Sequence, residues 1–148
     1  MKTYTITTIS QMFDIPASTL RYYESVGLLS NVDRHHNQRV YTDCHIQRLH
    51  AIECFKNTGL SISKMLDFFA YEKNLETNID DILTLVTDHE RSIISQIEQM
   101  QKDLLHIQKK VTYYTAIKEA INTNSAWPNW DEVEQSGQVH IISLNPSF

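Results

Sequence analysis

The stretch "STLRYYESVGLL", residues 18–29, has the apolar spacing of a short helix that stops at a glycine. Pro16 precedes it and suits the start of a helix, because its φ is fixed at a helical value and no N–H is needed there. We therefore expect a helix from about Ala17 to Val26. Gly27 should end this helix, with the two leucines that follow folding back.

Another short helix should precede this one. In "TTISQMFDI", residues 7–15, apolar side chains recur at helical spacing. Thr7 or Thr8 stands before them and can serve as the N-cap. Two short helices with a tight link predict a helix-turn-helix.

The second helix should have two distinct faces. Leu20 and Tyr23 fall on the side that can pack on the first helix. Ser18, Arg21 and Tyr22 fall on another side, at i, i+3 and i+4. A hydroxyl, a guanidinium and a phenol together suit contacts with phosphates and with base edges in a major groove.

A polar segment, "NVDRHHNQRVYTD" at residues 31–43, follows the helix-turn-helix. Val32, Val40 and Tyr41 favour strands, and the polar middle predicts a small hairpin that turns around His36–Gln38. This short ribbon concentrates hydrogen-bond donors, as expected of a wing that lies along the phosphate backbone.

Spacing alone leaves a structural alternative open for the exposed helix face. Arg21 would then pair with Glu24 or Glu53, and both tyrosines of the helix would belong to the core. The donor-rich hairpin beside the helices shifts the balance toward DNA. The residues that we predict to contact DNA are Ser18, Thr19, Arg21, Tyr22, Tyr23, Arg34, His36, Asn37, Arg39 and Tyr41.

Two further helices should follow the hairpin. The third runs from Thr42 to about Thr58, with apolar residues on one face. The segment "TGLS" then breaks the chain, and Ser61 caps a fourth helix that reaches about Phe69.

Residues 79–122 carry a heptad pattern, the most regular feature of the sequence. One set recurs every seven positions: Ile79, Val86, Ile93, Met100, Ile107, Tyr114 and Ile121. The complementary set is Leu83, Ile97, Leu104 and Val111, and only Glu90 and Lys118 interrupt it. A helix of roughly 60 Å, at ~1.5 Å per residue, cannot bury this stripe on a small head. We therefore expect a homodimer, with its seam at Val86, Ile93, Ile97, Met100, Leu104, Ile107, Val111 and Tyr114.

Composition and charge limit the function classes. The chain has 148 residues and a formal net charge of −5, but residues 1–66 carry seven Lys/Arg against five Asp/Glu, a net charge of +2. A weakly basic head is compatible with nucleic-acid binding. No long apolar run or signal peptide is present, so we expect a soluble, cytoplasmic protein. The sequence shows no catalytic set or metal-binding cysteine cluster, and we expect neither enzymatic activity nor a cofactor or metal.

The segments "YTITTISQMF", "STLRYYESVGLL", "RVYTD" and "NTGLSISKML" resemble MerR-type transcriptional regulators in their order and spacing. The resemblance is close over residues 4 to about 70 and extends in kind to the long helix. It implies a mainly α fold, a winged helix-turn-helix head with a small β-hairpin wing, followed by a long antiparallel coiled-coil dimerisation helix. It also implies binding to promoter DNA with an over-long spacer, which the protein distorts so that RNA polymerase can use it. The expected parts are the head at 1–70, a linker at 71–78, the dimerisation helix at 79–122 and a tail at 123–148. In the tail we expect a short strand at Val139–Leu144, and two tryptophans, Trp127 and Trp130, that dock on the rest of the protein.

Four positions depart from the family pattern. Asp14 replaces the usual turn glycine, and Pro16 the usual helix cap. The wing is about one residue shorter and lacks its turn glycine, and His45 stands where an acidic residue is frequent. These differences bear on the wing geometry and the operator sequence rather than on the fold.

The sequence indicates the signal that the protein senses less clearly than it indicates DNA binding. "CFKNTGLSI", from Cys54, resembles the segment around the single cysteine of small aldehyde- and thiol-stress-responsive family members. Arg48 and Lys56 lie near it in sequence and would favour the reactive thiolate. Alternatively, Cys54 is a small buried hydrophobe, and Cys44 is a weaker sensor candidate. In another function class, the chain is a coiled-coil adaptor whose head binds protein, which a weak salt dependence of binding would indicate.

Overall fold

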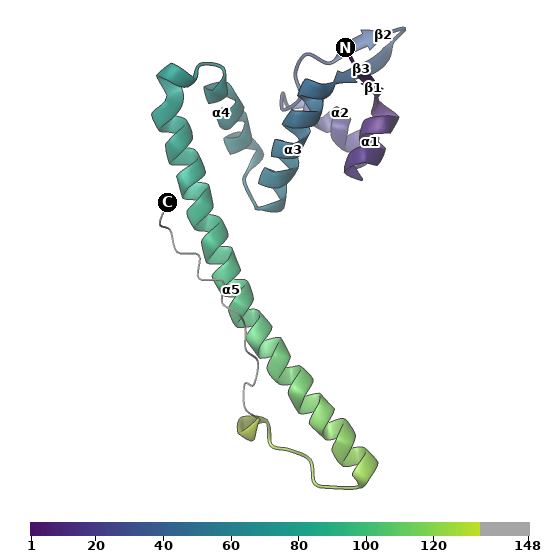
Figure 1. The fold of residues 1–148 in the computed structure, drawn as a ribbon, viewed down its shortest axis with the longest axis vertical. Helices are drawn as coiled ribbons and strands as arrows, with labels where there is room; N and C mark the ends of the chain where they lie inside the picture. Colours follow the sequence, from purple (N-terminus) through teal and green to yellow (C-terminus); the bar gives the residue numbers. More distant parts are fainter. Residues whose placement is uncertain (134–148) are drawn as a thin grey trace. The chain divides into compact units, whose positions relative to one another are not determined.

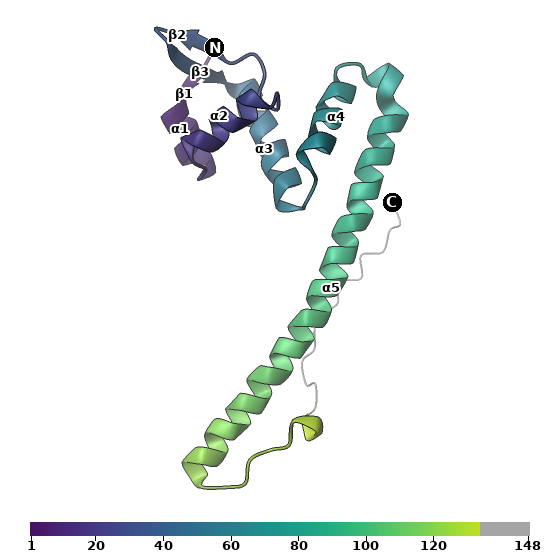
Figure 2. The ribbon, with the colours of Figure 1, turned by 180° about the vertical axis from the view of Figure 1, so that it is seen from behind.

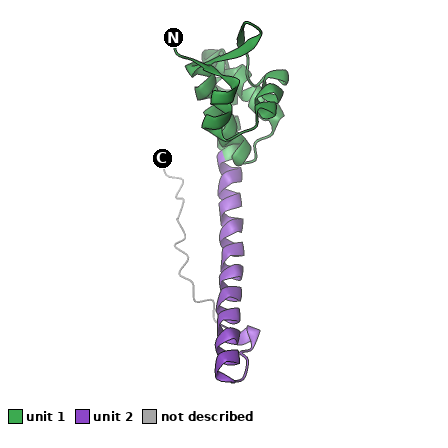
Figure 3. Cartoon of the chain, turned by 90° about the vertical axis from the view of Figure 1, so that its right-hand side faces the viewer, with its two compact units in different colours: residues 1–89 green, residues 90–148 purple. Residues whose placement is uncertain are grey.

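The computed structural model describes residues 1–133, so the strand expected at Val139–Leu144 lies outside the described residues. The chain divides into two compact units, of which the first spans residues 1–89 and the second begins at residue 90 (Figure 3). The elements, labelled in Figure 1 and seen from behind in Figure 2, are β1 (Thr3–Thr5), α1 (Ile6–Phe13), α2 (Ala17–Ser25), β2 (Asp33–His35), β3 (Gln38–Thr42), α3 (Asp43–Asn57), α4 (Ile62–Glu72), α5 (Leu75–Thr123) and the 3-10 turn η1 (Trp130–Glu132). The mainly α fold with a small sheet and a long helix is confirmed.

The two helices of the helix-turn-helix form where the sequence places them. The cap of α1 is Thr5, whose hydroxyl accepts from the N–H of Thr8, so the prediction of Thr7 or Thr8 as N-cap is wrong. Asp14 ends α1 in the left-handed region, at φ 52°. Asp is one of the few residues other than glycine that tolerate this conformation. Pro16 occupies the N-cap of α2 without a side-chain bond.

Gly27 ends the second helix in the way that the sequence predicts. Its φ is +88°, a conformation that costs glycine nothing and other residues appreciably. A Cβ at this position would meet only a Leu66 methyl at 3.8 Å, so backbone conformation rather than space requires the glycine. The amides of Leu28 and Leu29 then donate to the carbonyl of Tyr23, which turns both leucines into the core.

The wing is part of a three-stranded antiparallel sheet in the order β1-β3-β2. The turn between β2 and β3 consists of His36 and Asn37, at φ 48° and 66°. Positive φ at both central residues is the mark of the tight two-residue hairpin turn, which needs no glycine when asparagine and histidine accept it. The sequence analysis missed β1, whose residue Tyr4 lies opposite Tyr41 of β3.

His45 forms the cap that joins the wing to α3. The N–H of Thr42 donates to Nδ1 of His45 over 2.9 Å, so Nδ1 is the unprotonated nitrogen. Nε2 therefore carries the proton and donates to the carbonyl of Ser30 over 3.0 Å. The buried ring thus takes the place of the Glu or Gln side chain of a capping box, and ties the start of α3 to the loop after α2.

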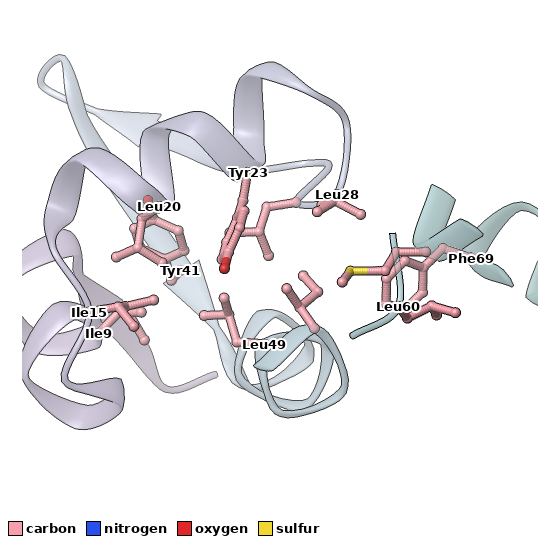
Figure 4. Packing of buried hydrophobic residues seen from close by; sticks show 12 residues of the cluster. Ile9, Ile15, Leu20, Tyr23, Leu28, Tyr41, Leu49, Leu60 and Phe69 are labelled. Carbon is pink, nitrogen blue, oxygen red and sulfur yellow. The ribbon is translucent and has the colours of Figure 1, made fainter. Parts of the chain in front are cut away.

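The core of the head draws on every helix up to α4. Ile9 of α1, Leu20 of α2, Tyr41 of β3 and Leu49 of α3 are fully buried (Figure 4). The α4 helix adds Met65 and Phe69 to the same cluster. One hydrophobic cluster therefore fixes the exposed face of α2 relative to the wing.

The predicted linker at residues 71–78 is largely helical. The α4 helix reaches Glu72 and α5 already begins at Leu75, which leaves two residues between them. Leu85 of α5 packs against the hydrophobic cluster of the head. The first turns of the long helix therefore belong to the first compact unit, which ends at residue 89 instead of 70.

In the second unit the chain folds back after α5. The Trp130 ring lies edge-on to Tyr113, with ring centroids 5.2 Å apart, and the Lys109 Nζ lies 4.4 Å from its centroid. The docking predicted for the tryptophans is thus seen for Trp130, whereas Trp127 is 64% exposed. Trp130 meets a polar face of α5 at His106, Lys109 and Lys110, and within residues 1–133 the heptad stripe stays exposed from Ile97 to Tyr114.

Candidate nucleic-acid interface

The α2 helix presents the polar face that its spacing predicts. Ser18, Arg21 and Tyr22 are exposed, and Thr19 beside them is half-buried in the first turn. Arg21 forms no ion pair within residues 1–133. The alternative that Arg21 is held by Glu24 or Glu53 is not supported, because both carboxylates have other partners.

Glu24 binds the wing to α2. Its carboxylate accepts from the Arg39 Nε over 2.5 Å, and a second oxygen lies 3.6 Å from the guanidinium of Arg34. The hydrogen bond from Arg39 to Glu24 raises the pKa of this arginine above its usual value. Sequence reasoning missed the role of Glu24, although its place in "LRYYE" on the side of α2 toward the hairpin could have suggested it.

Two residues of the predicted contact set lie in the core instead. Tyr23 is buried, and its hydroxyl donates to Glu53 over 3.0 Å. Tyr41 is fully buried against the edge of the His45 ring. Burial raises the pKa of both phenols above their usual value, and for Tyr23 the bond to Glu53 adds to the effect. The structure therefore does not support direct DNA contacts by these two side chains, because Tyr23 is only 2% exposed and Tyr41 0%.

The wing tip carries the remaining predicted contacts. His36 and Asn37 form the turn and are exposed, and Arg34 on the strand before it has 47% of its side chain exposed. Arg39 lies lower on the wing, with only 22% of its side chain exposed, since it serves the bond to Glu24. The head thus presents Arg21 on α2 together with the imidazole of His36 and the amide of Asn37 at the wing tip. Glu24 of α2 holds the wing beside the helix.

This arrangement of helix-turn-helix and wing matches a known family. Residues 4–70 match the model of the MerR HTH family regulatory proteins. Over 117 residues the chain is 31% identical to an HTH-type transcriptional regulator of Haemophilus influenzae, covering 78% of this chain and 87% of the relative. The chain belongs to the MerR family. It is a DNA-binding transcriptional regulator of that family and not an enzyme.

Two further MerR-family similarities extend the comparison to a solved structure and to another regulator. The crystal structure of HiNmlR, a MerR family regulator lacking the sensor domain, bound to promoter DNA, aligns with a TM-score of 0.72 at 29% identity, over 84% of this chain and 92% of that one. The regulator AdhR of Bacillus subtilis is 29% identical over 90 residues, which are 60% of this chain and 64% of AdhR. The similarity to HiNmlR extends well past the head, so the long helix is part of the shared architecture.

The cysteines of the regulator are accessible. Cys54 and Cys44 are both free and exposed, so the alternative that Cys54 is a small buried hydrophobe is wrong. The guanidinium of Arg48 packs on the Phe69 ring, 4.0 Å from the ring centroid. Burial lowers the pKa of Arg48 below its usual value, against the opposing effect of Glu72.

The predicted seam residues lie along α5. Val86 and Ile93 are half-buried, whereas the other six are exposed, by 38% to 69%. The exposed members are Ile97, Met100, Leu104, Ile107, Val111 and Tyr114. Ile107, Val111 and Tyr114 also line a shallow groove of about 410 Å³.

No helix within residues 1–133 is both long and apolar enough to cross a membrane.

Proposed function

We propose that this regulator binds promoter DNA as a homodimer and controls transcription by distorting the promoter. The observation that carries the proposal is the exposed Arg21 on α2, which forms no ion pair within residues 1–133, beside a wing that Glu24 holds in place. A guanidinium left free on a projecting helix can bind a phosphate or the edge of a guanine. Ser18 and Tyr22 on the same face add a hydroxyl and a phenol as further donors.

The exposed stripe of α5 supports the homodimer. Large apolar side chains continue at alternating spacings of three and four along the helix, from Ile97 to Tyr114, without cover from the described part of the chain. An apolar stripe of this spacing is buried by a second helix of the same kind. Another copy of the chain supplies such a helix with matching length and pattern.

Promoter binding is supported by a structural neighbour. HiNmlR is bound to promoter DNA in its crystal structure. In a dimer, two α2 helices read two half-sites, while the DNA between them can be bent or twisted without being touched. Such a protein would act on a promoter together with RNA polymerase.

Two binding measurements test the DNA assignment. Sequencing the genomic fragments that the purified protein retains should reveal a promoter with an inverted repeat. The affinity for that promoter should fall steeply with salt, with a log–log slope of roughly −0.9 per phosphate neutralised. The Arg21→Ala variant should bind all sequences more weakly and show a slope smaller by about 1, with an unchanged dimer. An adaptor that binds protein would show neither the retained promoter nor the salt dependence.

We further propose that Cys54 senses electrophiles, aldehydes or oxidants. Its exposure supports this, because a sensor thiol must be reached by the reagent. Phe55, the next residue, contacts Phe68 of α4 with ring centroids 4.9 Å apart, so an adduct on Cys54 would act close to a packed aromatic cluster. Cys54→Ser should leave promoter binding intact and abolish the response to an aldehyde, with Cys44→Ser as the matched control. An unchanged response in Cys54→Ser would exclude this sensor.

A further inference from the structure

A hydrogen-bond chain joins the end of α3 to α5. The Thr58 hydroxyl donates its hydrogen to the carbonyl of Cys54 over 2.7 Å. Its oxygen lies 2.7 Å from Nε2 of His89 on α5. Because the single hydroxyl hydrogen is already given to Cys54, the His89 ring must be the donor in the second bond. A neutral ring protonated at Nε2 and a fully protonated ring both provide this donor.

The His89 ring also packs on the aromatic cluster of the head. It lies edge-on to Phe55 of α3, with ring centroids 6.0 Å apart and an interplanar angle of 70°. Phe55 in turn contacts Phe68 and Phe69 of α4 in the same edge-on manner. His89 is therefore held both by a directional hydrogen bond and by an aromatic contact of favourable geometry.

This joint lies where the head passes into the long helix. The chain link between α4 and α5 is only two residues long, and Leu85 of α5 also packs against the hydrophobic cluster. The heptad stripe continues on α5 beyond residue 89, where it is available to a second copy. Whatever fixes α3 to α5 therefore fixes the head to the first turns of α5.

We propose that His89 is a positioning residue for operator binding, which sets the separation of the two α2 helices in the dimer through Thr58 and Phe55. This inference rests on the proposed binding of promoter DNA by a homodimer. Two half-sites on one face of DNA lie a helical turn or a multiple of it apart, about 34 Å per turn. A dimer whose heads are already at that separation binds without the cost of ordering them. Without the joint, the DNA itself must order the heads.

The test compares two DNA fragments and two pairs of variants. One fragment is the recovered promoter with both half-sites, and the other carries a single half-site. His89→Ala removes the joint, while His89→Gln keeps an N–H donor; Thr58→Val removes the hydroxyl, while Thr58→Ser keeps it. Thr84→Ala, an exposed polar residue on the same helix, serves as the matched control.

His89→Ala removes both the hydrogen bond and the aromatic contact and should weaken binding to the two-site promoter by about tenfold, whereas Thr58→Val removes only the hydrogen bond and should weaken it by about fivefold. Binding to the single half-site should stay within about twofold of wild type, and sedimentation should still show a dimer. Changing the half-site separation by one or two base pairs should harm these variants less than wild type. Thr58→Ser and Thr84→Ala should behave like wild type, and His89→Gln should lose less than His89→Ala because it keeps the hydrogen bond. The double variant should lose no more than His89→Ala alone, which already removes the bond.

Three results would overturn the inference. In the first, His89→Ala binds the two-site promoter like wild type; in the second, it loses the same factor on the single half-site. In the third, His89→Gln fails as His89→Ala does, which would reduce the residue to general packing. If His89→Ala does not fold, the Thr58→Val and Thr58→Ser pair decides. A wild-type protein that is monomeric or retains no DNA would instead refute the proposed function, and this inference with it.

Discussion

Replacing Tyr41 by phenylalanine should stabilise the head. Tyr41 is fully buried, and its hydroxyl has no hydrogen-bond partner within the described residues. The ring packs edge-on to His45, with centroids 5.8 Å apart, and phenylalanine retains that contact. The substitution therefore removes an unsatisfied polar group and leaves the packing unchanged.

The size of the effect follows from the cost of an unpaired buried group. Such a group costs about 1–3 kcal/mol, because it loses its hydrogen bonds to water and gains none in the protein. Since the hydroxyl of Tyr41 remains close to the polar wing, we expect Tyr41→Phe to raise the free energy of unfolding by about 1 kcal/mol. The raised pKa of Tyr41 is consistent with this, because burial disfavours its ionised form.

Tyr23→Phe is the matched control and should have the opposite sign. It removes a hydroxyl that donates to the carboxylate of Glu53, so the free energy of unfolding should fall by about 1–2 kcal/mol. Both variants should be measured by urea denaturation at one fixed protomer concentration, because the stability of a dimer depends on concentration. Promoter affinity should be measured beside stability.

The reasoning would be refuted if Tyr41→Phe lowered the free energy of unfolding by about 1 kcal/mol or more. That result would mean that the hydroxyl has a partner in solution. A loss of promoter affinity at unchanged stability would instead restore Tyr41 as a direct DNA contact, and would reverse the correction made from its burial.

Three more predictions concern the stripe of α5, the pKa of Tyr23 and the ion pair of Glu24. A charge in the stripe, as in Leu104→Glu, should dissociate the dimer in sedimentation and abolish promoter binding, because a seam position cannot bury an unpaired carboxylate; a persisting dimer would contradict this. Above about pH 10, the usual pKa of tyrosine, the stability of the head should decline. The raised pKa of Tyr23 makes the folded state retain a proton that the unfolded state releases, and Tyr23→Phe should show a weaker decline. Glu24→Gln should lower the free energy of unfolding by about 1 kcal/mol, after allowance for partial solvent screening, and increase amide exchange in the wing, whereas a wing of unchanged protection would disprove the clamp.

Much of the fold could be predicted from local signals. Pro16 marks the start of α2 because its ring restricts φ, and Gly27 marks its end because glycine permits a positive φ. Both effects are independent of the surrounding structure. The exposed face of Ser18, Arg21 and Tyr22 followed from helical periodicity alone. The β1 strand could not be predicted in this way, because three residues carry too little pattern and pair with a strand almost forty positions later.

The candidate site shows where local reasoning ends. The sequence by itself determined a helix-turn-helix, a hairpin and a long helix with a heptad stripe, because periodicity and turn chemistry are properties of neighbouring residues. Only the tertiary structure decided that Tyr23 and Tyr41 are core residues, that Glu24 holds the arginines of the wing, and that His89 meets Thr58. These roles depend on contacts between side chains from distant segments of the chain. Burial and pairing energies are determined by such contacts and not by the order of residues in the sequence.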